Sequence, residues 1–142
     1  EVLEQLIHRA IQVKCEVVEE DFRESGRRAH LNLGHTFGHA LESVAGFGAW
    51  THGEAVSWGI GCALRLSVQL GLAQQSYADD VEALLVDYGF RLECGLPADA
   101  LMAAMQADKK KHAGTVRFIL QEGPQVTVQR EVPAESVRSV LR

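Results

Sequence analysis

The stretch LNLGHTFGHALE, residues 31–42, indicates a helix that carries two histidines on one face. His35 and His39 stand four residues apart, and side chains at this spacing leave the same side of a helix. Glu42 lies three residues beyond His39 on that side, and Asn32 falls on or near the same stripe. A helix uses this spacing to offer two nitrogens to one metal, or one to a metal and one to its substrate.

Gly34 and Gly38 share the four-residue spacing of the histidines. Each glycine costs a helix about 1 kcal/mol relative to alanine, so the pair needs a physical reason. Close approach of another backbone or of a ligand is the reason we expect.

A third histidine, His52, follows in the sequence THGE at a position where a helix is expected to begin. The turn before it can fold the chain back onto the preceding helix. Three histidines could supply most of a catalytic zinc site, which uses three protein ligands and one open position. Glu54 is a further possible ligand, although an acidic residue in the first turn of a helix is ordinary. Two hydrogen-bonded structural histidines remain the alternative for the His35–His39 pair.

The remaining pattern predicts a mainly α fold with one small β-hairpin near the C-terminus. Apolar residues recur every three or four positions in most of the chain, which is typical of helices. We expect one domain, residues 1–142, with helices at 2–20, 28–44, 52–70, 75–88, 97–111 and 133–142, and hairpin strands at 115–121 and 125–131.

Charge and cysteine content narrow the class of protein. The net charge of −5, with both signs interspersed, argues against nucleic acid as a partner. The three cysteines form no CxxC pair, which favours a reduced, cytoplasmic protein. The apolar run AVSWGIGCAL at 55–64 is too short to cross a membrane. The run DKKK at 108–111 fits a solvated helix end, with an anion site as the alternative.

Four stretches together resemble the C-terminal domain of the 3-dehydroquinate synthases. They are QVKCEVVEEDFRESG at 12–26, RRAHLNLGHTFGHALE at 27–42, THGEAVSWGIGCALRLSVQLGL at 51–72 and ADKKKHAGTVRFIL at 107–120. GHTFGHALE and HGEA are far more specific than two spaced histidines. The resemblance implies a zinc-dependent lyase of the shikimate pathway, in which the helical C-terminal domain carries zinc and an N-terminal domain binds NAD.

The resemblance also assigns roles residue by residue. It implies that His35 and His52 bind zinc, or another divalent metal such as cobalt, and that His39 is catalytic. Lys14, in VKCEVV, corresponds to a family lysine that contacts the substrate. The resemblance therefore makes Lys14 a second candidate catalytic residue. Arg28 corresponds to the arginine that binds the substrate carboxylate.

Binding of the substrate phosphate is implied for an asparagine and for one of two neighbouring lysines. Asn32 matches the asparagine of the LNxGH motif, and either Lys109 or Lys110 matches a phosphate-binding lysine. The substrate implied is 3-deoxy-D-arabino-heptulosonate 7-phosphate, and the products are 3-dehydroquinate and phosphate.

One part of the family pattern has no match in this chain. The family's third zinc ligand is a glutamate in an AEVIK-like motif upstream of the lysine that matches Lys14. We therefore expect a fragment that is inactive alone, and a homodimer for the full enzyme. A related cyclase acting on another seven-carbon sugar phosphate, or a non-catalytic metal-binding domain, are the alternatives.

Overall fold

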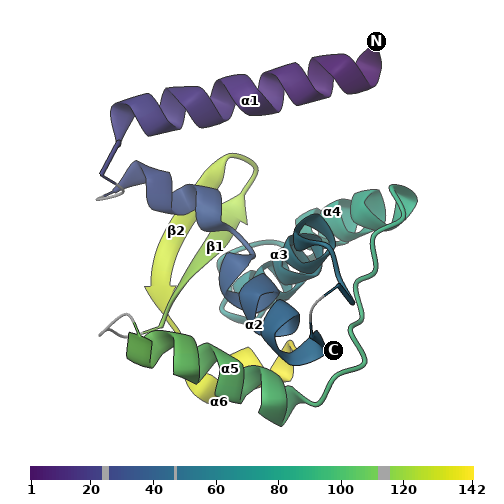
Figure 1. The fold of residues 1–142 in the computed structure, drawn as a ribbon, viewed down its shortest axis with the longest axis vertical. Helices are drawn as coiled ribbons and strands as arrows, with labels where there is room; N and C mark the ends of the chain where they lie inside the picture. Colours follow the sequence, from purple (N-terminus) through teal and green to yellow (C-terminus); the bar gives the residue numbers. More distant parts are fainter. Residues whose placement is uncertain (24–25, 47, 112–115) are drawn as a thin grey trace. The chain divides into compact units, whose positions relative to one another are not determined.

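The computed structural model describes residues 1–23, 26–46, 48–111 and 116–142, without the side chains of 108–111. The chain forms two compact units, Glu1–Asn32 and Leu33–Arg142 (Figure 1). Helices dominate, and one two-stranded sheet lies near the C-terminus. The predicted fold class is therefore confirmed.

The first unit consists of a long helix followed by a short, tighter one. α1 spans Val2–Glu20, as predicted, and η1 is a 3₁₀ helix over Arg27–Asn32. The carboxylate of Asp21 joins them, because its Oδ2 accepts hydrogen bonds from the backbone N–H of Gly26 at 2.8 Å and of Arg28 at 3.1 Å. This turn fixes where the second helix begins.

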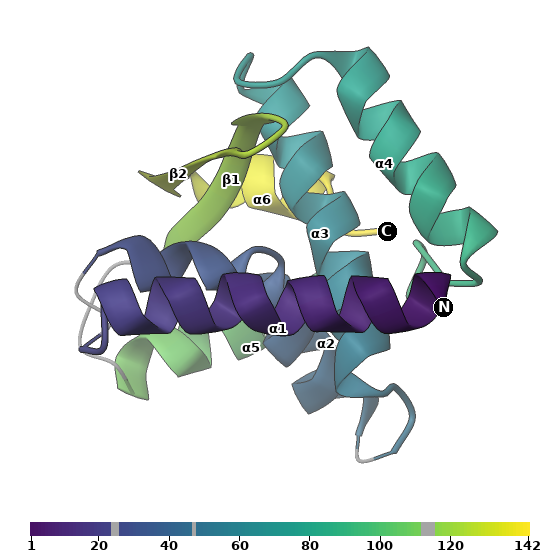
Figure 2. The ribbon, with the colours of Figure 1, turned by 90° about the horizontal axis from the view of Figure 1, so that it is seen from above.

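The second unit is built around one central helix, α3. Figure 2 shows α4 and the hairpin on different sides of it, and α3 contacts α2, α4, β1 and α6. The elements are α2 (His35–Ala45), α3 (His52–Gln69), α4 (Gln75–Asp87), α5 (Ala98–Lys111), β1 (Arg117–Gly123), β2 (Val126–Glu131) and α6 (Ala134–Ser139).

The hydrophobic core of this unit gathers buried side chains from α2, α3, α5, β1 and α6. Phe37 of α2 meets Trp58 of α3 edge to face, with ring centroids 6.4 Å apart, and packs against Phe118 of β1 at 5.1 Å. Trp58 is fully buried, so its indole N–H needs a partner. The backbone carbonyl of Arg142 accepts that hydrogen bond at 2.8 Å.

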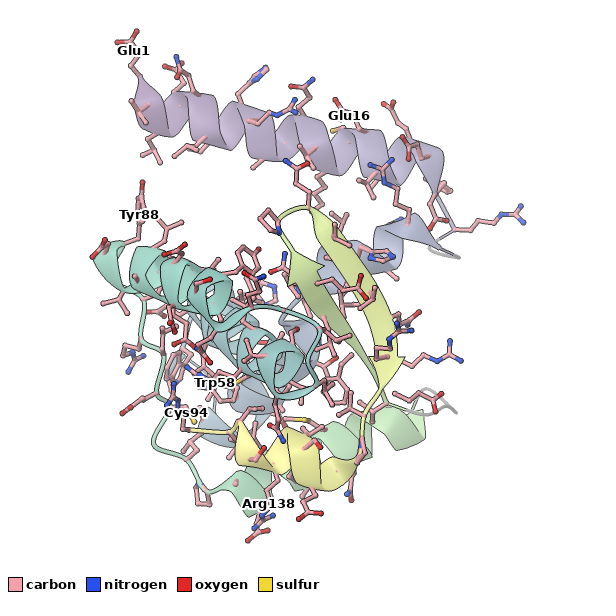
Figure 3. The ribbon with its side chains drawn as sticks, turned by 180° about the vertical axis from the view of Figure 1, so that it is seen from behind. Glu1, Glu16, Trp58, Tyr88, Cys94 and Arg138 are labelled. Atoms are coloured by element: carbon pink, nitrogen blue, oxygen red, sulfur yellow. The ribbon has the colours of Figure 1, made fainter. Side chains whose placement is uncertain are left out.

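The last helix is shorter than the predicted range 133–142, because α6 ends at Ser139. Beyond it the chain leaves the helix and brings the Arg142 carbonyl to two donors, Trp58 Nε1 and the backbone N–H of Cys94 at 3.3 Å. Figure 3 shows Trp58 and Cys94 near each other. A continued helix would not deliver this carbonyl to the core.

The predicted helix 28–44 is wrong in its first part. The chain forms η1 up to Asn32, turns at Gly34 with φ at +78°, and begins α2 at His35. A left-handed φ cannot continue a right-handed helix and suits glycine best. Asn32 therefore does not share a helical stripe with His39, which corrects the expectation from spacing.

The glycines of the motif permit close packing of α2 on α3, as expected. A Cβ added to Gly34 would lie 2.7 Å from the Ile60 nitrogen, and one added to Gly38 would lie 3.1 Å from the Ala55 oxygen. From the other side, a Cβ on Gly59 would lie 2.1 Å from the Gly34 carbonyl oxygen. The backbones of α2 and α3 are therefore in contact at these glycines, which have no Cβ.

The hairpin closes one side of the core. β1 and β2 pair antiparallel, with Leu120 opposite Val128, and the register shifts between Gln121 and Gly123. The backbone N–H of Gln121 donates to the hydroxyl of Ser67 on α3 at 3.1 Å, which ties the sheet to the central helix. Among the described residues, no helix is long and apolar enough to cross a membrane.

The cysteines differ in their expected reactivity. Cys15 is exposed, whereas Cys62 is buried and burial raises the pKa of its thiol to about 12. The thiolate is the reactive form, so Cys62 should stay unmodified in the folded protein while Cys15 reacts. Alkylation with iodoacetamide followed by peptide mass spectrometry tests this. Rapid labelling of Cys62 before unfolding would contradict the packing of α3.

Candidate metal centre

Three imidazole rings meet where the first turn of α3 lies beside α2. His35 and His39 come from α2, and His52 is the first residue of α3. The ring centroids are 5.3 Å apart for His35–His52, 5.5 Å for His35–His39 and 5.9 Å for His39–His52. The structure thus brings together the three histidines that the sequence singled out.

A capping box fixes the position of His52. The Thr51 hydroxyl accepts from the backbone N–H of Glu54 at 3.3 Å, while the Glu54 carboxylate accepts from the Thr51 N–H and hydroxyl, both at 2.7 Å. These hydrogen bonds hold the pKa of Glu54 below its usual range. Glu54 therefore stabilises the start of α3, and its carboxylate is engaged by Thr51.

His35 is held by a backbone carbonyl. Its Nδ1 lies 3.2 Å from the Leu33 oxygen, and because a carbonyl can only accept, Nδ1 carries the proton. The lone pair is then on Nε2. Burial lowers the pKa of the His35 imidazole, and the neighbouring His39 and His52 act in the same direction. The neutral form is the one that binds metals.

His52 is held in the same way by a side chain. Its Nδ1 lies 3.2 Å from Oε1 of Glu42, one helical turn beyond His39 on α2. A carboxylate accepts, so Nδ1 donates and Nε2 keeps the lone pair. The ring of His39, by contrast, makes no hydrogen bond with the described part of the chain. Two rings are thus anchored at Nδ1 and one is free.

His39 also borders a cavity of about 150 Å³ between α2 and α5. Small and polar side chains form most of its wall, so a hydroxylated ligand could enter. The lining residues are Thr36, His39, Ala40, Ser43, Ala104, Met105 and Ala107. Thr36 and Ser43 were not predicted as site residues, although their helical spacing around His39 would have indicated them.

The donor set fits a divalent metal such as zinc, which binds imidazole nitrogen and carboxylate oxygen. His39, Glu42 and His52 offer ligand atoms within 4.8 Å of one another. The sequence resemblance names a different set, His35 and His52. Both sets share His52. The Glu42 carboxylate of the first set is hydrogen-bonded to His52 Nδ1, and Nε2 stays available on His35 and His52.

The other predicted site residues lie elsewhere in the chain. Lys14 is an exposed residue of α1, Arg28 is half-buried in η1, and Asn32 ends η1, so all three belong to the first unit. The Arg28 guanidinium donates to the Phe22 carbonyl at 3.1 Å. Lys109 and Lys110 lie on α5, but their side chains are outside the described residues.

A model of the family described as 3-dehydroquinate synthase C-terminal matches residues 1–111. The chain belongs to the 3-dehydroquinate synthase family. Curated 3-dehydroquinate synthases agree with it over nearly its whole length. One from Synechococcus sp. is 44% identical over 140 residues, covering 96% of this chain and 38% of the relative. Another, from Nitrosospira multiformis, is 44% identical over 142 residues, covering 99% and 39%.

The chain spans about two-fifths of the length of these curated relatives. Solved structures of 3-dehydroquinate synthase-like cyclases share its fold. One is a 2-epi-5-epi-valiolone synthase from Streptomyces hygroscopicus with NAD⁺ and Zn²⁺ bound. The match covers 96% of this chain and 38% of the synthase chain, with 21% identity and a TM-score of 0.85. Another is a 2-deoxy-scyllo-inosose synthase complexed with carbaglucose-6-phosphate, NAD⁺ and Co²⁺. The match covers 97% of this chain and 40% of the synthase chain, with 25% identity and a TM-score of 0.83.

Proposed function

We propose that this chain is the metal- and substrate-binding part of a 3-dehydroquinate synthase. The enzyme would convert 3-deoxy-D-arabino-heptulosonate 7-phosphate to 3-dehydroquinate and phosphate. The observation that carries this proposal is the cluster of His35, His39 and His52 in a chain of this family. Below, the complete protein means a polypeptide of the relatives' length that contains this chain. We expect it to be a cytoplasmic homodimer.

His35 and His52 are the metal ligands in this proposal. Each has Nδ1 engaged by an acceptor and Nε2 available. A third ligand, the family's upstream glutamate, would come from the rest of the complete protein. The related cyclases carry Zn²⁺ or Co²⁺ and NAD⁺, so we propose zinc or cobalt as the metal and NAD as the second cofactor, bound mainly by the N-terminal domain.

His39 is the group that moves a proton. Its ring borders the cavity and is free of hydrogen bonds to the described residues, so it can accept or donate one to a substrate hydroxyl. The metal, held by His35 and His52, would supply Lewis-acid polarisation of that hydroxyl, and NAD would supply hydride transfer. Histidine is the side chain that most often serves as a general acid or base in enzymes.

The remaining residues would bind the substrate's anionic groups and orient it. Arg28 offers a planar pair of donors for the carboxylate. Asn32 offers an amide, and Lys109 or Lys110 a point charge, for the phosphate. In this proposal Lys14 contacts the substrate from α1. Binding of both the carboxylate and the phosphate would restrict the orientations that the substrate can adopt.

An assay of the complete protein tests this function. We expect it to release phosphate from 3-deoxy-D-arabino-heptulosonate 7-phosphate and to form 3-dehydroquinate. The rival is a related cyclase that uses another seven-carbon sugar phosphate, and two other cyclases share the fold. Turnover of another seven-carbon sugar phosphate instead would support that rival. Metal binding without turnover of either sugar would support a non-catalytic metal-binding domain.

The isolated chain should bind zinc weakly. His35 and His52 leave the coordination sphere incomplete, because catalytic zinc sites normally use three protein ligands. Calorimetric titration of the 142-residue chain with zinc measures this directly. Tight binding of one equivalent would show that the local set of His39, Glu42 and His52 completes a site without an outside ligand.

A further inference from the structure

The carboxylate of Glu42 links the two helices that carry the histidines. It extends from the last turns of α2 to the first residue of α3, where Oε1 lies 3.2 Å from His52 Nδ1. The side chain of Glu42 is 32% exposed, whereas that of His52 is 58% exposed. The Glu42 side chain is therefore more buried than the ring that it contacts.

We propose that Glu42 is a positioning residue, which holds His52 in the tautomer and orientation that present Nε2 to the metal. This proposal rests on the proposed metal-binding function. A solvent-exposed imidazole can rotate and can carry its proton on either nitrogen. One acceptor on Nδ1 removes both freedoms, because it fixes the ring plane and leaves the lone pair on Nε2.

His35 provides an internal comparison. There the Leu33 carbonyl holds Nδ1 at the same distance, 3.2 Å, that separates Glu42 from His52. Each of these histidines is the first residue of its helix, but no described backbone oxygen accepts a hydrogen bond from the His52 ring. Glu42 supplies from α2 the acceptor that α3 lacks. Nδ1 of each ring therefore faces an acceptor, and the two ring centroids are 5.3 Å apart.

Two variants of the complete protein separate positioning from direct metal binding. Glu42→Gln keeps an oxygen that accepts from Nδ1, whereas Glu42→Ala removes it. We expect Glu42→Ala to weaken zinc affinity by about 10- to 100-fold in chelator competition, the usual loss when the outer partner of a metal-bound histidine is removed. Glu42→Gln should retain most of the affinity. Glu135→Ala, which removes an exposed carboxylate on α6, is the matched control and should bind as wild type.

The ¹⁵N chemical shifts of the His52 ring in the metal-free protein give a second measurement. We expect the Nδ1–H tautomer in wild type and in Glu42→Gln, and a mixture in Glu42→Ala. Equal zinc loss in Glu42→Gln and Glu42→Ala would overturn the proposal and make Glu42 a ligand. Wild-type affinity in Glu42→Ala would also overturn it. Failure of the proposed function is distinct, because wild type itself would then bind no metal or convert no substrate.

Discussion

Replacing His39 with alanine in the complete protein is expected to lower turnover by about 10²- to 10⁴-fold, the usual contribution of a general acid–base group. The metal content should stay close to wild type. His39 lies one turn beyond His35 on α2, its ring is free of hydrogen bonds to the described residues, and it borders the cavity. In the proposed function it would therefore reach a substrate hydroxyl while His35 and His52 would hold the metal.

Metal analysis and steady-state kinetics on the same purified sample separate the two roles. His35→Ala is the matched comparison, since it removes a ring from the same helix and should deplete the metal together with the activity. A His39→Ala protein that is free of metal would make His39 a ligand. One that keeps both metal and full activity would make His39 a packing residue.

Gly59→Ala is expected to destabilise the protein by about 3 kcal/mol, the upper end of the usual cost of overpacking a core. The added Cβ would lie 2.1 Å from the Gly34 carbonyl oxygen and 3.1 Å from the Gly38 nitrogen. Both atoms belong to the backbone, so no side-chain rotation can relieve the contact. The helices α2 and α3 would have to separate, and the histidines that they carry would separate with them.

Gly53→Ala is the control for this substitution. Gly53 lies in the same helix, but a Cβ there would meet nothing within 4 Å. Its free energy of unfolding should be unchanged or higher by up to about 1 kcal/mol, because alanine loses less entropy in a helix. Urea denaturation of both variants gives the difference. Equal stability of Gly59→Ala and wild type would refute the close backbone contact of α2 and α3.

The sequence predicted most of this architecture because periodic apolar residues report helices directly. The range 2–20 matched α1, and 52–70 matched α3 to within one residue. The two glycines at 34 and 38 correctly indicated close approach of a backbone. The break at Gly34 was missed, because a glycine needed for close packing and one needed for a left-handed φ look the same in sequence.

The site was predictable only in part. Spacing placed His35 and His39 on one face of a helix, and the turn before THGE indicated that His52 could return to them. The anchors at Nδ1 were not foreseen, because the Leu33 carbonyl is a backbone group and the contact of Glu42 with His52 joins different helices. Long-range contacts of this kind depend on the packing of α2 against α3, which periodicity does not specify.

Anomalous diffraction at the zinc edge from crystals of the zinc-loaded complete protein tests the central assignment most directly. We expect one zinc ion at about 2.0–2.1 Å from Nε2 of His35 and from Nε2 of His52, the usual zinc–imidazole distance. The ring of His39 should lie outside the coordination sphere, and Glu42 should remain hydrogen-bonded to Nδ1 of His52. Zinc bound instead by His39 and Glu42, with His35 uncoordinated, would contradict the account.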